Sequence, residues 1–589
     1  MKTREGVVGA EFDPVLVEVI NNELGAITEE MAIIIWRTSQ SPMLKSGDFA
    51  TAVCDARGRI IGQGFAAPFQ LAAFNDLMVH VLARYGRDFA AGDVIITNDP
   101  YAGMTHMPDV AVIVPVMVDG ETAAFCLAYS HHSDMGGRFP GSASSQCRSS
   151  YEEGLRIPIV KLVERGRRDE VLLDLVGANI RVPDEWRGDL DAKIAGCLRG
   201  AEQTQQLIRS HGLRSYMSAC DFVIEYAERS MRAAIRQAPD GTYTAQYVVP
   251  DDGATDEGRI LLQLSLRIAG EEITVDFAGS SPQVAGALNT PLTMTKAAVY
   301  GALKAIISPE VPTNDGFFRP IHVTAPPGSV VNPRFPAAVA GRAPIFFRIF
   351  DMVYAALSQA LPGQVPVMGE GGDLLHFSAE GGSHVPFAFL DLYFGGWGGR
   401  PDRDGIDGVA PVYMGSYGCV SAELLEAQFP IVVDGFGFVQ DSEGAGRHRG
   451  SVAIYRQWRF LAPGHAMIRS VRVGPSPGLE GGSPGAPART MLERRGEKID
   501  VGGKTHVHVD VEAGDRMYHA TAGAGGYGVP WLRDPHEVLA DCRAGLISIA
   551  GAQERYGVVL DGSGDIDWPE TNRVRLGSAM MTGTAVRGG

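Results

Sequence analysis

Residues 97–109 read TNDPYAGMTHMPD, and two apolar runs follow them at 110–116 and 122–130. Because a short Val-Asp-Gly segment separates the two runs, we expect neighbouring antiparallel strands joined by a tight turn. In such a pair, the start of the first strand lies beside the end of the second. The polar residues just before the first run are therefore expected to meet those just after the second run, at one edge of a sheet.

His106, Asp109 and His131 are the side chains with metal-binding chemistry at that edge. Two imidazoles and a carboxylate suit one divalent ion of zinc, manganese or iron. Three or four protein ligands also leave room for a water molecule, whose pKa the metal lowers towards neutrality. Histidines packed in a core are a commoner origin of such spacing, so at this point both interpretations stand.

The residues that follow His131 add further candidates. His132 could be a ligand, a donor to substrate or a structural residue, and Asp134 could orient an imidazole. The glycine pair at 136–137 would let the backbone approach a ligand closely. His132 and Asp134 are therefore our candidates for proton transfer in a reaction at the metal.

Apolar periodicity and turn residues predict the surrounding elements. Residues 13–38 show helical spacing behind Asp13 and Pro14, a typical helix start. Further helices are predicted at 75–85, 169–180, 186–211, 220–237, 294–307, 536–540 and 546–556. Besides the two runs above, strands are predicted at 51–55, 59–63, 94–97, 242–249, 259–268 and 272–277, with mostly strands and loops in 320–335, 384–460 and 485–550.

These elements indicate a large multidomain protein of mixed α and β structure. A chain of 589 residues exceeds one ordinary domain. We expect an N-terminal α/β metal-binding region at 1–240, a central α+β region at 241–420 and a C-terminal β-rich region at 421–589.

The composition is that of a folded acidic protein. Apolar residues make up 45% of the chain, and the net charge is −17. This charge argues against binding to nucleic acid or to an anionic membrane surface. The seven cysteines are scattered without a CxxC pair, and the sequence lacks a signal-peptide pattern and any apolar run of bilayer length. We therefore expect a cytoplasmic location.

Other candidate sites have weaker patterns. The glycine-rich stretches 395–399 and 523–528 do not match GxxxxGK[ST], so they indicate tight turns or cavity-lining loops rather than an ATP site. Cys147 lacks the sequence context of a catalytic nucleophile. Glu152 and Glu153 could act as a general base or bind substrate, although a solvated or salt-bridged carboxylate is the commoner case.

The pattern NDPYxGxTHxPD at 98–109, followed by HHxDxGG at 131–137, resembles the hydantoinase B/oxoprolinase family. The resemblance extends over about residues 10–560 as one family unit. Seven further stretches match in the same order, at 46–50, 153–158, 276–280, 286–291, 332–337, 441–447 and 523–528.

The resemblance implies a metal site and a partner. The family's ligands fall on His106, Asp109 and His131, with Asp48 as a fourth ligand that spacing alone does not nominate. An A-type partner subunit would bind ATP and phosphorylate a carbonyl oxygen of the substrate, and the B-type subunit would complete the reaction at its metal. A hetero-oligomer such as α2β2 is therefore expected.

Candidate substrate-binding residues come from matching and from departing stretches. Glu153 and Asn289 lie in stretches that match the family. Gln70, in APFQLA at 67–72, stands where the family usually has a histidine. The stretch at 341–348, GRAPIFFR, replaces an Asn-x-Glu-Thr-like run. Both departures are expected near the substrate or the subunit interface.

The leading hypothesis is ATP-dependent hydrolysis of a cyclic amide of the hydantoin, oxoproline or lactam kind. Phosphorylation would turn the carbonyl oxygen into a leaving group, and the metal would supply hydroxide or polarise the activated carbon. One alternative is the metal-binding subunit of an acetone- or acetophenone-type carboxylase, in which C–C bond formation replaces hydrolysis. A second is a non-catalytic scaffold that stabilises the partner.

Overall fold

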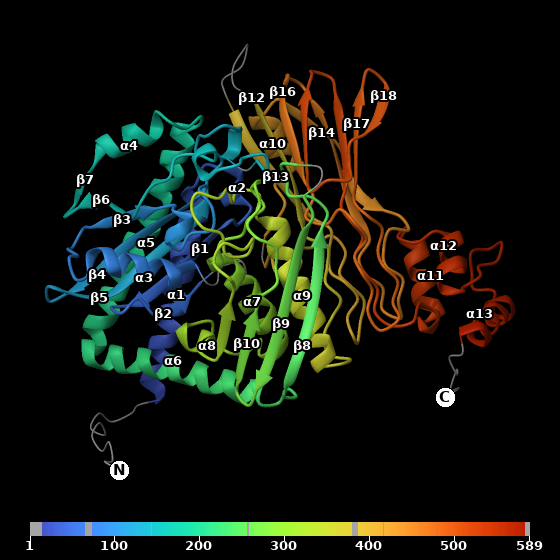
Figure 1. The fold of residues 1–589 in the computed structure, drawn as a ribbon, viewed down its shortest axis with the longest axis horizontal. Coiled ribbons are helices and arrows are strands. Elements are labelled where there is room, and N and C mark those ends of the chain that lie inside the picture. The colour runs from blue at the N-terminus through green and yellow to red at the C-terminus, as the bar shows by residue number, and fades with distance from the viewer. Residues whose placement is uncertain are drawn as a thin grey trace.

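Four sheets organise the parts of the chain that the structure describes. The computed structural model describes residues 14–64, 73–142, 144–255, 258–379, 387–415 and 417–582. The first sheet, drawn in blue and cyan in Figure 1, has the strand order β2-β1-β5-β4-β3-β6-β7. Its strands are β1 (Phe49–Asp55), β2 (Ile60–Gln63), β3 (Val94–Thr97), β4 (Asp109–Val118), β5 (Glu121–His131), β6 (Val160–Glu164) and β7 (Arg167–Arg168).

Two long helices cover this sheet. α1 (Pro14–Thr38) and α5 (Pro183–His211) pack against each other, and α5 lies on β4 and β5. α1 buries side chains three or four residues apart, which form one apolar face. The helix predicted at 13–38 is confirmed from Pro14 onward, and Asp13 lies outside the described residues. The other helices of this region are α2 (Pro42–Lys45), α3 (Ala73–Tyr85), α4 (Glu170–Gly177) and α6 (Leu213–Ile235).

The second sheet, green in Figure 1, has the order β11-β10-β9-β8 and packs against a buried helix. Its strands are β8 (Gly241–Val249), β9 (Ile260–Ala269), β10 (Glu272–Asp276) and β11 (Ile321–Thr324). α7 (Leu292–Ile307) packs on α9 (Ala343–Ala360), which lies on β8 and β9, and α8 (Asp315–Phe318) packs on α6. The sequence patterns did not predict α9. Most of its side chains are buried, so it lacks the alternation of apolar and polar faces that reveals a helix.

The third and fourth sheets lie side by side on the right of Figure 1 and share an apolar core. Their orders are β13-β12-β16-β19 and β14-β15-β20-β17-β18. The strands are β12 (Gly372–Ala379), β13 (Phe387–Phe394), β14 (Ile431–Val439), β15 (Ala453–Phe460), β16 (Gly464–Arg469), β17 (Arg489–Arg494), β18 (Glu497–Asp500), β19 (His506–Val511) and β20 (Arg516–Ala520). The remaining helices are α10 (Ala422–Gln428), α11 (Pro535–Arg543), α12 (Ile549–Tyr556) and α13 (Trp568–Thr582).

The predicted fold class, a large multidomain protein of mixed α and β structure, is confirmed. The predicted boundary near 240 falls between α6 and β8, where one sheet ends and the next begins. The boundary near 420 falls inside a structural unit of another kind, because the third sheet joins strands from both sides of it.

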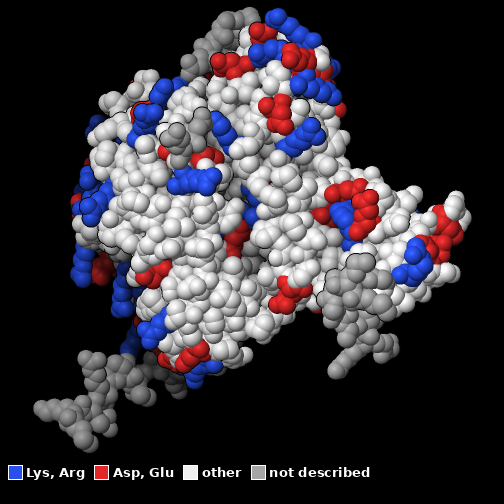
Figure 2. All heavy atoms as spheres, turned by 45° about the vertical axis from the view of Figure 1, so that its right-hand side comes forward, with Lys and Arg blue, Asp and Glu red and all other residues white. Residues whose placement is uncertain are grey.

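Neither a membrane span nor one dominant charge marks the described part of the molecule. Among the described residues, no helix is both long and apolar enough to cross a bilayer. Figure 2 shows basic and acidic side chains in small mixed groups on one face, separated by wide uncharged areas.

Candidate metal centre

Strand register brings three candidate ligands into one row. The β4–β5 ladder pairs Asp109 with His131. The β1–β5 ladder pairs Phe49 with Ser130, so Asp48 is the next position along, and the His131 N–H donates to the Asp48 carbonyl at 3.3 Å. Residues opposite each other in a ladder project on the same face. The predicted meeting of strand start and strand end at one edge is therefore confirmed.

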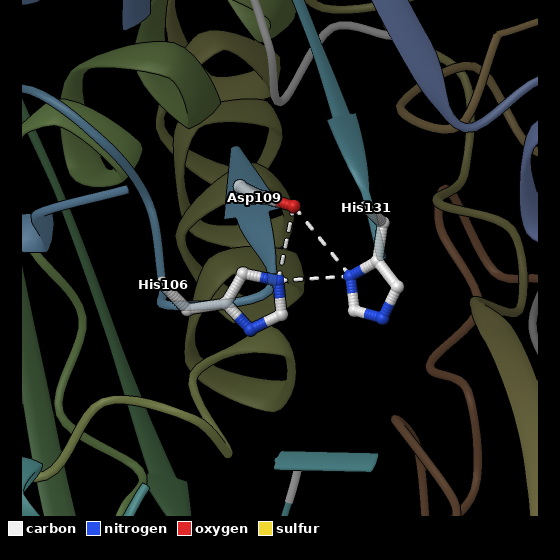
Figure 3. A group of neighbouring side chains, drawn as sticks. All are labelled: His106, Asp109 and His131. Carbon is white, nitrogen blue, oxygen red and sulfur yellow. Dashed lines mark hydrogen bonds and ion pairs between the residues drawn. The ribbon is translucent and has the colours of Figure 1, made fainter. Parts of the chain in front are cut away.

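The side chains of His106, Asp109 and His131 point towards one another (Figure 3). His106 Nε2 lies 3.1 Å from Asp109 Oδ1 and 3.0 Å from His131 Nδ1. His131 Nδ1 lies 3.5 Å from Asp109 Oδ1. Ligands about 2.1 Å from a shared metal ion stand roughly 3.0–3.4 Å apart at octahedral to tetrahedral angles. These three atoms therefore fit the first coordination sphere of one divalent ion.

Burial and hydrogen bonds prepare these groups for a cation. Desolvation, together with the nearby Arg342, lowers the pKa of His106 to about 3, so its imidazole is neutral with a free lone pair at physiological pH. Burial opposes ionisation of Asp109, yet His106 and its other partners hold the pKa of Asp109 well below its usual range. The Thr105 hydroxyl donates to Asp109 Oδ2, and Arg342 Nη2 lies 3.4 Å from the same oxygen. Oδ1 is thereby left facing the histidines.

Asp48 lines the same cavity but has a separate partner. The Tyr417 hydroxyl donates to Asp48 Oδ1, and burial raises the pKa of Asp48 to about 6. Its carboxylate is not among the three converging groups found in the described residues. Its role as a fourth ligand stays a prediction.

The cavity around these ligands has mostly apolar walls. Its charged or polar lining consists of Asp48, the three converging residues, Arg342 and Arg469. The apolar lining comes from α2, α7, α9, β12, β13, β16 and two loops, and consists of Met43, Met294, Ala340, Ala343, Phe346, Phe347, Leu374, Leu390, Leu392, Met414 and Met467. The metal edge of the first sheet thus faces α9 and the third sheet.

The two predicted proton carriers have contacts outside the cavity lining. His132 is buried against Trp186, and its Nε2 lies 2.7 Å from Lys193 Nζ on α5. Asp134 accepts hydrogen bonds from the backbone N–H groups of Gly136, Gly141 and Arg181, which hold the loop after β5. Their part in proton transfer stays a prediction.

The predicted substrate-binding residues are also dispersed. Glu153 is buried, accepts from the N–H groups of Val339 and Ala340, and has its pKa raised by burial to about 8. The Asn289 amide holds backbone carbonyls, including that of Ala338 at 2.9 Å. Neither side chain lines the cavity, and Gln70 lies outside the described residues. Their substrate contacts stay predictions.

The glycine-rich stretches pack backbone against backbone, as expected of tight loops. A Cβ on Gly396 would lie 2.4 Å from the Ile406 carbonyl oxygen, and one on Gly523 would lie 1.7 Å from that of Ser442. Such approaches leave space only for glycine. Neither stretch contributes to the cavity lining.

Sequence reasoning missed three residues of the site. Tyr417 and Arg469 reach it from positions far along the chain, and Arg342 was noticed as a departure without a role. No local pattern marks the first two. Thr105 stood beside His106 in the quoted stretch, and its position four residues before Asp109 was the signal available for a hydroxyl partner.

Comparisons with known proteins follow the same chain from end to end. The sequence model of a family described as hydantoinase B/oxoprolinase matches residues 13–530. The B-type subunit of a putative D-/L-hydantoinase from Pseudomonas sp. (strain NS671) is 30% identical over 586 residues, covering 96% of this chain and 98% of the relative. The crystal structure of an ATP-dependent caprolactamase from Pseudomonas jessenii matches with a TM-score of 0.88 and 28% identity, over 96% of this chain and 100% of that one. A nucleotide-free acetone carboxylase structure also gives 0.88, over 98% and 84% of the two chains, but at 18% identity that likeness shows the fold alone.

Proposed function

Because the chain belongs to the hydantoinase B/oxoprolinase family, we propose that it is the metal-binding B-type subunit of an ATP-dependent cyclic amidohydrolase. Its substrate is a cyclic amide of the hydantoin, oxoproline or lactam kind, and its product is the ring-opened acid. A partner of the A type binds ATP and phosphorylates the amide carbonyl oxygen. The two proteins form a cytoplasmic hetero-oligomer such as α2β2, so this chain alone is inactive.

One observation carries the proposal: His106 Nε2, Asp109 Oδ1 and His131 Nδ1 converge in a buried cavity. The chain that holds them is similar over its full length to the B-type subunit of a hydantoinase and the β-type subunit of a caprolactamase. A scaffold without catalytic duty would have no need of neutral imidazoles beside an oriented carboxylate. The site therefore supports a chemical role.

The division of labour follows from amide chemistry. Resonance with nitrogen makes an amide carbonyl a poor electrophile, and phosphorylation on the partner turns its oxygen into a leaving group. A divalent metal ion supplies hydroxide at neutral pH or polarises the activated carbon. His106, Asp109 and His131 hold that ion, with Asp48 as fourth ligand.

The remaining residues orient these ligands and exclude water. Thr105 and Arg342 fix Oδ2 of Asp109, so that Oδ1 faces the histidines. The apolar walls keep bulk water from an activated intermediate, which would otherwise hydrolyse before it reaches the ligands.

The test is reconstitution with an A-type partner. The purified complex is incubated with ATP and a panel of hydantoins, 5-oxoproline and lactams, while ADP release and ring-opened product are measured. We expect ATP turnover that depends on a cyclic amide, yields one ring-opened acid per ATP and needs no bicarbonate. The proposal fails if no cyclic amide of the panel stimulates ATP hydrolysis.

A ketone carboxylase subunit is the second candidate, and the likeness to acetone carboxylase supports its fold alone. The same assay separates the two reactions. ATP turnover that requires both a ketone and bicarbonate, and ignores cyclic amides, would replace our proposal with the carboxylase. Unchanged activity of a complex that carries His106→Ala would instead favour a scaffold.

A further inference from the structure

Two arginines lie beside the predicted ligands on the cavity wall. Arg342 stands at the start of α9, and Arg469 ends β16. Arg342 is 6% exposed and Arg469 is half-buried. The Nε of each is buried and has no hydrogen-bond partner among the described residues. Because a guanidinium keeps its charge and donors when buried, these groups are available to a bound anion.

The other contacts of the two guanidinium groups hold them in place. Arg342 Nη2 donates to Thr105 Oγ1 at 3.0 Å, which ties the arginine to the Asp109 carboxylate. Arg469 Nη2 donates to the Gly372 carbonyl at 3.1 Å. Within the described ranges, no carboxylate forms an ion pair with Arg469, whereas Arg342 shares Asp109 with the metal ligands. Arg469 is therefore a cation without a counter-ion on the cavity wall.

The charges of the cavity favour a dianion. The two arginines balance Asp48 and Asp109, so a bound divalent ion leaves two positive charges in excess. The N-terminal end of α9 adds positive potential, since Ala343 at its first turn also lines the cavity. Apart from these groups, the described lining is apolar and offers a ligand no second polar anchor.

We propose that Arg342 and Arg469 form an anion subsite for a phosphoryl group on a ligand whose remaining body is uncharged and apolar. A phosphoryl dianion matches the excess charge, and the guanidinium donors suit its oxygens. The inference rests on the proposed function for the identity of the ligand, a phosphorylated cyclic amide. It narrows the substrate class to rings with hydrocarbon substituents and no second charge.

Inorganic phosphate is the probe for this subsite. Its binding to the full-length, metal-loaded chain is measured by calorimetry, with acetate as a monoanionic carboxylate for comparison. We expect phosphate to bind at least tenfold more tightly than acetate. Arg469→Met should weaken phosphate binding at least tenfold, which is about 1.4 kcal/mol. Arg459→Met is the matched control, since this exposed arginine on β15 pairs with Asp434 away from the cavity, and it should leave phosphate affinity unchanged.

Three results would overturn the subsite. They are equal phosphate affinity in the wild type and Arg469→Met, no phosphate binding at all, or acetate binding as tight as phosphate, which would make the ligand a carboxylate. Arg469→Lys keeps the charge but loses the planar fork, so we expect intermediate affinity. If circular dichroism shows that the Met variant does not fold, an undiminished affinity in the Lys variant overturns the inference. Failure of the proposed function is distinguishable, because it would abolish amide-dependent ATP turnover while phosphate binding persists.

Discussion

Two pairs of stacked histidines in this molecule look alike and differ in their third member. The rings of His106 and His131 lie 4.8 Å apart, with ring nitrogens 3.0 Å from each other. The rings of His465 and His508, on β16 and β19, lie 5.4 Å apart, with ring nitrogens 3.1 Å from each other. Each pair also has an aspartate at hydrogen-bond distance, Asp109 in the first and Asp510 in the second.

The position of the carboxylate separates the two groups. Asp109 Oδ1 lies near the same two nitrogens that face each other. Asp510 Oδ1 lies 2.9 Å from His465 Nδ1, the nitrogen turned away from His508, and the Asp510 side chain is 95% exposed. The first group converges on a point inside a buried cavity, whereas the second is a chain that runs to solvent. Convergence of lone pairs, rather than the number of histidines, is what a metal site requires.

The strongest test of this contrast is the loss of one imidazole from each pair. His106→Ala removes one of three converging ligands, so we expect stoichiometric metal content to fall below one tenth of the wild-type value and activity of the complex to disappear. His508→Ala makes the same change in the chain-like group and should leave metal content unchanged. Plasma emission spectrometry of the dialysed proteins measures both.

Equal metal content in the wild type and His106→Ala would remove the metal site that we propose. A loss of metal in His508→Ala as large as in His106→Ala would show that the two groups do not differ as their geometries indicate. Both variants leave the β4–β5 ladder intact, because His106 lies before β4 and His508 lies on another sheet.

A smaller effect is expected from the group that orients the carboxylate. Thr105→Val keeps the side-chain shape but removes the hydroxyl that donates to Asp109 Oδ2. Losing such an outer partner typically lowers metal affinity by about 10- to 100-fold. Thr51→Val is the matched control, because its buried hydroxyl donates to the Thr28 carbonyl in the same sheet. Competition with a chromophoric chelator gives both affinities, and an equal weakening in both variants would argue against a specific role for Thr105.

The sequence could predict the first group because local rules sufficed. A tight turn fixes the register of β4 and β5, and that register alone brings Asp109 beside His131. Asp48 needed the family resemblance, confirmed by the family match, because β1 joins β5 only through the tertiary fold. Arg469 and Tyr417 were beyond reach, since they arrive from other sheets and loops through contacts without a local signature.

The same limit applies to the elements. α1 was predictable because one face is buried and the other exposed, so its apolar side chains recur at helical spacing. α9 was not, because it is buried on nearly all sides. Buried helices of this kind line the cavity, and their sequences resemble those of buried strands. The parts of the site that sequence patterns miss are therefore those that form its walls.

The smallest expected effect concerns stability and again contrasts the two groups. Burial, with His465 nearby, lowers the pKa of His508 to about 4. Between about pH 6.5 and pH 4, the unfolded chain binds a proton at His508 that the folded chain does not, so the free energy of unfolding falls as the pH drops through this window. His508→Gln removes that dependence, worth on the order of 1 kcal/mol at pH 5 after allowance for partial exposure. Melting temperatures of both proteins from pH 7.5 to pH 4.5 should therefore converge or cross towards acid, with metal content unchanged at pH 7.5. Parallel melting curves would mean that His508 titrates alike in both states, and the chain-like group would then be a solvated surface feature.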